Sequence, residues 1–187
     1  MRGLPHHVPG SGAGPIGAIC LAALLATPAQ AVTYAFCWQG GAGYRIEGTI
    51  SYPDGRTGLL TETDLTGFAI RGFRGPVQVG KWNLATAEAD DPVTIRFDAD
   101  ALAFPMGGWR SSDTYQEWNA GGTADDCGNP GFGFNGGNRA QDVCVNGAFI
   151  DESGVPPDTP LAVAADPASP CGPAPMSARP NLRRPIG

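Results

Sequence analysis

The sequence predicts an all-β fold, an antiparallel sandwich or small barrel with a long excursion rich in glycine and aromatic residues. Two observations predict it. Over residues 34–104, short runs of β-branched and aromatic residues alternate with Gly, Pro, Asn and Asp, as in hairpin-linked strands. No window of about 12 residues carries an apolar stripe with the helical period. Helix is therefore expected to be minor, and the crossover helices that a parallel sheet needs have no sequence to occupy.

Residues 44–52 show the clearest strand pattern. Apolar side chains from Tyr44 to Tyr52 alternate with polar ones, which predicts a half-buried strand. Pro53-Asp54-Gly55 then supplies a turn, because Pro fixes φ and Gly tolerates a positive φ. A short helical turn is expected at residues 61–64, where Thr61 can act as the cap. The other expected strands are residues 33–38, 65–73, 77–84, 93–97 and 143–150.

The N-terminal segment has the layout of a secretory signal peptide over residues 1–31. Arg2 precedes an apolar stretch at residues 16–26, and Ala29-Gln30-Ala31 offers small residues at the cleavage positions. The apolar stretch is about half of the roughly 20 residues needed to span hydrocarbon. We therefore expect cleavage after Ala31, a mature chain of 156 residues, and a secreted or periplasmic protein without a membrane span after cleavage.

Charge and histidine content exclude several functions. The formal net charge of -6 disfavours nucleic acid as a partner. Both histidines, His6 and His7, lie in the expected leader. The mature chain would then have no Ser-His-Asp or Cys-His nucleophile system and no His-ligated metal site.

Cleavage would also remove Cys20 and leave four cysteines in an exported chain, which predicts two disulfides. Three pairings are possible, and the sequence does not fix one. We favour a disulfide between Cys127 and Cys144, because their separation in the sequence suits a disulfide that closes the Gly-rich excursion. Cys37 and Cys171 are then left to pair with each other. A zinc site is the weaker alternative, because the chain has no CxxC spacing.

The chain is expected to comprise a leader at 1–31, a β domain at 32–153 and a Pro-rich tail at 154–187. Within the domain, residues 107–138 are rich in Gly, Asn, Asp and aromatic residues, and we expect this excursion to pack on its own aromatic side chains. Nine of the last 34 residues are Pro. The tail is therefore expected to be extended and mostly disordered, with Cys171 as its only fixed point.

Two sequence patterns could indicate a chemical site, but for each of them a purely structural interpretation is favoured. Residues 131–136 match GxGxxG, but Pro130 precedes them and no helix pattern follows, so a turn is favoured over a dinucleotide site. Asp98 and Asp100 would share a face about 6.6 Å apart if their strand continues, near the lower edge of the inverting glycosidase range. Arg96 on the same face can neutralise Asp98, so a solvated face is favoured, with a cation site or catalysis as alternatives.

The excursion holds two candidate binding groups. Asp125 and Asp126, followed by four more Asn and Asp residues up to position 142, gather the hard oxygen ligands that suit Ca²⁺, with ordinary polar turns as the alternative. Trp109, Tyr115 and Trp118 are interleaved with polar residues, as in a carbohydrate-binding face where flat rings stack on sugars. Large aromatic residues are also what a small disulfide-bonded domain buries, and packing is the favoured interpretation of these three rings.

Several short motifs follow one another between residues 36 and 104. They are Gly-Thr-Ile at 48–50, Asp-Gly at 54–55, Gly-Leu-Leu-Thr at 58–61, Asp-Leu at 64–65, Phe-Ala-Ile at 68–70 and Lys-Trp-Asn-Leu at 81–84. Together they resemble a pattern in small exported bacterial proteins, many of which carry a PEP-CTERM sorting tail. The last eight residues lack the Val-Pro-Glu-Pro box and hydrophobic helix of such a tail. The resemblance implies export and a β fold, and it implies no activity.

The sequence therefore favours an exported non-enzymatic β protein that binds a surface glycan, Ca²⁺ or another surface component, or serves structurally. The alternative is a carboxylate-dependent hydrolase acting on extracellular polysaccharide. Such an enzyme needs a second carboxylate facing Asp98 or Asp100 across a cleft, whereas a binder needs exposed aromatic side chains without one.

Overall fold

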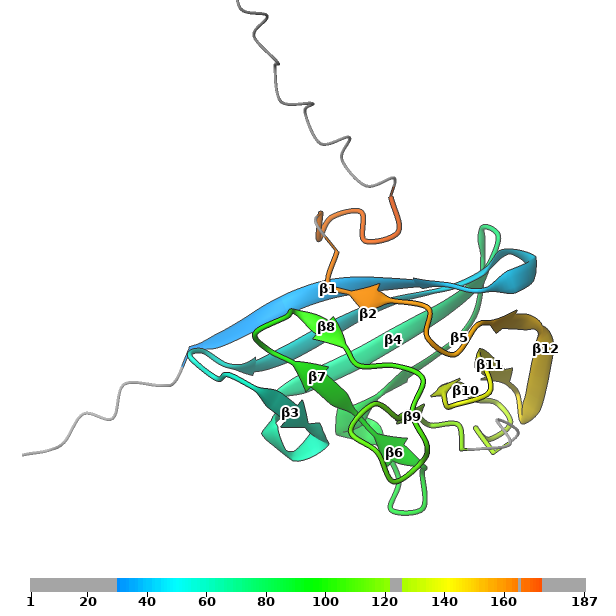
Figure 1. Cartoon of the computed structure of the whole chain (residues 1–187). Coiled ribbons are helices and arrows are strands. Elements are labelled where there is room, and N and C mark those ends of the chain that lie inside the picture. Colours follow the sequence, from blue (N-terminus) through cyan, green and yellow to red (C-terminus); the bar gives the residue numbers. More distant parts are fainter. Residues whose placement is uncertain (1–29, 122–125, 165, 173–187) are drawn as a thin grey trace, which may run out of the picture.

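The computed structural model describes residues 30–121, 126–164 and 166–172 (Figure 1). Its strands are β1 (Ala31–Gln39), β2 (Tyr44–Pro53), β3 (Leu59–Thr61), β4 (Gly67–Arg74), β5 (Val77–Asn83), β6 (Val93–Thr94), β7 (Arg96–Asp98), β8 (Ala103–Phe104), β9 (Gln116–Trp118), β10 (Phe132–Gly136), β11 (Gln141–Val145), β12 (Ala148–Val155) and β13 (Leu161–Ala162). The helical elements in these ranges are three short 3-10 turns, η1 (Gly41–Gly43), η2 (Glu62–Asp64) and η3 (Leu84–Thr86).

The strands form three antiparallel sheets. The first has the order β1-β2-β4-β5, the second β12-β11-β10-β9-β6 and the third β13-β8-β7-β3. The long strands of the first sheet make one layer, and the second and third sheets lie side by side against one face of it (Figure 1). Each sheet has open edges in the described residues, so the all-β fold predicted from the sequence is a sandwich.

The alternation predicted for residues 44–52 is the pattern that builds the first sheet. The apolar side chains from Tyr44 to Tyr52 are buried, while the polar ones between them face the other side. β1 pairs with β2 so that Phe36 lies opposite Gly48. A Cβ at Gly48 would overlap the Phe36 ring. The missing side chain lets the ring lie flat over the neighbouring strand.

Aromatic rings from all three sheets form one core. Phe36 and Phe68 come from the first sheet, Phe104 from the third and Trp118 from the second. The Phe36 and Phe104 ring centroids are 4.7 Å apart, and those of Phe68 and Trp118 are 4.9 Å apart. Since Trp118, Phe132 and Phe134 belong to this shared core, the prediction that residues 107–138 pack on their own aromatic side chains is wrong.

Most predicted strands are confirmed, and two need correction. Residues 93–97 form two strands in different sheets, β6 and β7. They separate at Ile95, whose N–H donates to the Glu62 carboxylate instead of a neighbouring strand. Residues 143–150 form a hairpin, because Asn146 and Gly147 have φ of 52° and 73° and make the turn between β11 and β12.

The predicted helical turn at residues 61–64 is confirmed as η2. Thr61 and Asp64 form a capping box, in which the Thr61 N–H donates to Asp64 Oδ2 at 2.9 Å. This hydrogen bond and the Thr61 hydroxyl hold the pKa of Asp64 below its usual range.

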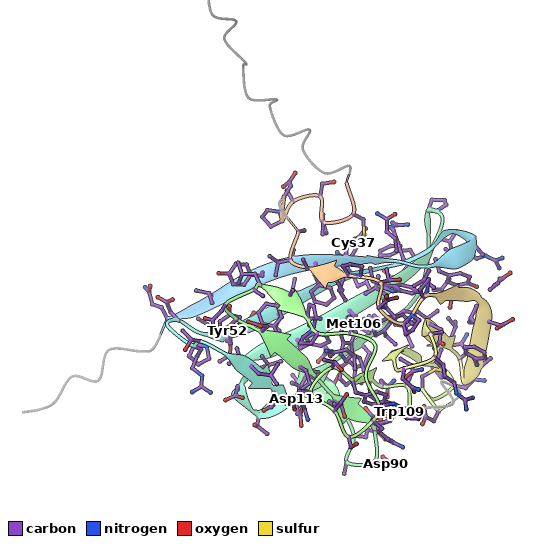
Figure 2. All side chains as sticks on the ribbon, viewed as in Figure 1. Cys37, Tyr52, Asp90, Met106, Trp109 and Asp113 are labelled. Carbon is purple, nitrogen blue, oxygen red and sulfur yellow. A yellow bond between two sulfur atoms is a disulfide. The ribbon has the colours of Figure 1, made fainter. Side chains whose placement is uncertain are left out.

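Both favoured disulfide pairings are confirmed. Cys127 joins Cys144, a separation of 17 residues, and is called the short disulfide below. Cys37 joins Cys171 across 134 residues and is called the long disulfide. Figure 2 labels Cys37 on the outer face of the first sheet, where the C-terminal segment reaches it.

The expectation of a mostly disordered tail is wrong for residues 154–164 and 166–172. β12 runs to Val155, and β13 pairs with β8. The Ala164 N–H then donates to the Ala35 carbonyl of β1 at 2.7 Å. The β domain therefore extends beyond residue 153.

The expected leader falls almost entirely outside the described residues, since these begin at Gln30. Cleavage after Ala31 stays a prediction. Among the described residues, no helix has the length and apolar character needed to cross a membrane.

Candidate functional site

A pocket of about 160 Å³ opens between the β8–β9 loop and the turn that follows β10. The loop contributes three lining residues, and β10 with its turn contributes four. They are Trp109, Arg110, Tyr115, Asn135, Gly137, Asn138 and Arg139. The pocket is smaller than the roughly 300–1,000 Å³ of sites for drug-sized ligands. Its size suits one small ring or one unit of a longer chain.

Local hydrogen bonds in the β8–β9 loop hold Trp109 at the surface. The Ser112 N–H and hydroxyl both donate to the Trp109 carbonyl at 2.8 Å, and the Gly108 N–H donates to the Thr114 carbonyl at 2.9 Å. A Cβ at Gly108 would overlap the hydroxyls of Ser112 and Thr114. Trp109, labelled in Figure 2, is 71 % exposed and is not part of the hydrophobic core.

A row of polar side chains crosses the second sheet next to the pocket. Thr94, Glu117, Asn135 and Asp142 lie opposite one another on β6, β9, β10 and β11. Their chain neighbours Trp118, Phe134 and Val143 are in the core. The polar row therefore occupies the other face of the sheet. Glu117, Asn135 and Asp142 are nevertheless only 3 %, 7 % and 4 % exposed.

Glu117 is a buried carboxylate with three donors. Its Oε1 accepts from Arg110 Nη2 at 2.8 Å and from the Tyr115 hydroxyl at 3.2 Å, and its Oε2 accepts from Thr94 Oγ1 at 3.4 Å. Burial, followed by the Glu117 charge, raises the pKa of Tyr115 to about 12. Tyr115 therefore remains a neutral donor at physiological pH.

Asn135 has one amide atom engaged and one free. Its Nδ2 donates to Asp142 Oδ1 at 3.4 Å, while its Oδ1 has no hydrogen-bond partner among the described residues. This amide orientation follows from chemistry, because an ionised Asp142 can only accept. A Cβ at Gly137 would lie 3.5 Å from Asn135 Oδ1, so the glycine lies close to this buried oxygen.

Asp142 is a buried carboxylate of this row, on β11. Burial raises its pKa to about 6. The hydrogen bond from Asn135 lowers it, and the charge of Asp151 on β12 raises it further. The amide of Asn135 therefore donates a hydrogen bond to the Asp142 carboxylate, which is mainly ionised at neutral pH and does not line the pocket.

The structure separates the three aromatic residues predicted to form one binding face. Trp118 is fully buried and packs against Phe68 and Phe104 in the core, so it has no face open to a ligand. Tyr115 is 3 % exposed and lines the pocket with part of its ring. Trp109 is the one of the three that presents its ring to solvent.

Of the two aspartates proposed to bind Ca²⁺, the structure describes one. Asp125 lies outside the described residues. Asp126 is exposed, and its Oδ1 accepts from the Gly121 N–H at 2.6 Å. Within the described ranges, no group of three or more His, Cys, Asp or Glu side chains is arranged to hold a metal ion. Calcium binding stays a prediction.

Asp98 and Asp100 do not form the pair that a continuing strand would create. β7 ends at Asp98, whose Oδ1 accepts from the N–H groups of Asp100 and Ala101 in a turn. Arg96 pairs with Glu62 at 2.8 Å instead of Asp98. These aspartates therefore stabilise a turn.

The GxGxxG segment is mostly strand, which corrects the predicted turn, since β10 covers residues 132–136. The sequence placed Glu117 among the polar residues between the aromatic rings and Asn135 among the candidate Ca²⁺ ligands, and Arg139 was not predicted as a site residue. The alternation of polar residues with Trp118 and Phe134 is the signal for the polar face that carries Glu117 and Asn135.

No protein-family model, curated protein or solved structure matches this chain. The site is therefore interpreted from its own chemistry.

Proposed function

We propose that this protein is an exported, non-enzymatic β protein that binds a glycan through the pocket beside Trp109. The observation that carries the proposal is the exposed ring of Trp109 at the edge of a pocket that the amide residues Asn135 and Asn138 also line. Amide side chains can both donate to and accept from sugar hydroxyls. The exposed indole offers flat apolar surface for the C–H face of the same ring.

The polysaccharide hydrolase left open by the sequence needs a carboxylate that reaches the ligand. None of the described residues that line the pocket is acidic. Glu117 and Asp142 contact Tyr115 and Asn135 without lining the pocket themselves. The arrangement therefore supports binding rather than hydrolysis.

Tryptophan fluorescence tests the proposal. Of the four tryptophans, Trp38, Trp82 and Trp118 are buried, so a change in emission on adding a ligand reports mainly on Trp109. We titrate the purified protein with a panel of neutral and acidic polysaccharides. At least one is expected to shift the emission to the blue, and Trp109→Ala is expected to weaken its binding by about tenfold or more, which is about 1.4 kcal/mol.

Two further variants locate the site. Gly137→Val adds a side chain to the pocket lining beside Tyr115 and Asn135 and is expected to block binding. Phe149→Ala removes another exposed aromatic ring, outside the pocket, and is expected to bind like the unmodified protein. No response to any polysaccharide, or undiminished binding by Trp109→Ala, contradicts the proposal.

A further inference from the structure

The pocket differs in charge from the protein as a whole. The chain has a formal net charge of -6. The side chains of the described residues that line the pocket and carry a charge at neutral pH are two arginines, Arg110 and Arg139, because Tyr115 with its pKa of about 12 is neutral. A cationic pocket on an acidic protein favours anionic ligands at this position.

The two arginines have different surroundings. Arg110 Nη2 lies 2.8 Å from Glu117 Oε1, and the Glu117 side chain is only 4 % exposed. The charge of Arg110 is therefore balanced by a carboxylate that itself requires a cation. Arg139 is exposed and forms no ion pair with a described residue. Its guanidinium is the uncompensated charge of the pocket.

These features set three requirements for one ligand. Arg139 needs an anion, and its planar fork of N–H groups matches a carboxylate through two parallel hydrogen bonds. The exposed Trp109 indole needs a flat apolar partner. The pocket volume of about 160 Å³ limits the bound group to about one ring.

We infer that the pocket binds a uronate unit of an acidic polysaccharide. The uronate carboxylate pairs with Arg139, and the sugar ring stacks on the exposed face of Trp109. This inference rests on the proposed glycan-binding function and names its ligand class.

Binding to matched pairs of polymers tests the inference. The probes are polygalacturonate, alginate and hyaluronan, each compared with its methyl ester, which keeps the backbone and removes the charge. We expect at least one acid form to bind about tenfold more tightly than its ester, with the difference shrinking as salt screens the ion pair. Arg139→Gln is expected to abolish the difference. Arg56→Gln removes one positive charge outside the pocket and is expected to leave it unchanged.

The possible failures are distinguishable. Equal binding of acid and ester, or a preference for the acid form that survives Arg139→Gln, overturns the uronate inference and leaves glycan binding in place. Equally tight binding of polyglutamate, which has charge and no sugar ring, also overturns it. No binding of any acid, ester or neutral polysaccharide overturns both the inference and the proposed function.

Discussion

Replacing Asp142 by Asn is expected to stabilise the protein at pH 8 and much less at pH 4. Burial raises the pKa of Asp142 from 3.8 to about 6. A shift of about two pKa units corresponds to about 3 kcal/mol between the two protonation states. Because the folded protein can relax around a buried charge, we expect about 2 kcal/mol. An Asn at this position removes the buried charge, and its side-chain oxygen can still accept from Asn135.

The sign follows from proton binding in the two states. Between about pH 4 and pH 6, Asp142 keeps its proton in the folded protein and loses it in the unfolded chain. The free energy of unfolding therefore falls as pH rises through this window, and the loss is complete above it. The Asp142→Asn variant lacks this pH-dependent loss of stability. The difference in the free energy of unfolding between the variant and the unmodified protein should therefore grow between pH 4 and pH 6 and stay constant above pH 6.

Thermal unfolding followed by circular dichroism from pH 4 to pH 8.5, at constant ionic strength, measures the effect. We expect the melting temperature of Asp142→Asn at pH 8 to exceed that of the unmodified protein by roughly 4–8 °C. Asp151→Asn is the control, because Asp151 is exposed and only the last of the causes that shift the pKa of Asp142. Parallel pH profiles for Asp142→Asn and the unmodified protein would refute the reasoning.

Two further predictions concern stability. Removing the long disulfide by paired Cys→Ala substitutions is expected to cost about 5 kcal/mol in urea unfolding, and removing the short one about 3 kcal/mol, because the longer loop restricts the unfolded chain more; the reverse order argues against this account. Gly48→Ala is expected to cost about 1–3 kcal/mol because its Cβ overlaps the Phe36 ring. Gly67→Ala is its control, because a Cβ at Gly67 would lie 3.6 Å from Ser51, and it is expected to change the free energy of unfolding little. Equal losses of stability in the two variants would show that the replacement of a strand glycine, rather than the contact with the Phe36 ring, causes the destabilisation.

Short-range signals in the sequence were sufficient for the strands and turns of the first sheet. The alternation from Tyr44 to Tyr52 predicted the buried face of β2, and Thr61 predicted the cap of η2. These features depend on side-chain direction and on hydrogen bonds a few residues apart. The two disulfide pairings were preferred from spacing alone, and the structure selected them among three possibilities.

The candidate site depends on neighbours that are distant in the sequence. Glu117, Asn135 and Asp142 meet because β9, β10 and β11 pair in one register, and a shift by one residue would exchange this polar row with the core face. The sequence placed Trp109 and Trp118 in the same aromatic group, yet Trp109 is exposed and Trp118 is fully buried. The sequence by itself determined an all-β chain with its turns and cysteines. Only the tertiary structure decided which side chains the sheets bury and which they bring to the pocket, because burial depends on the packing of strands that no local pattern specifies.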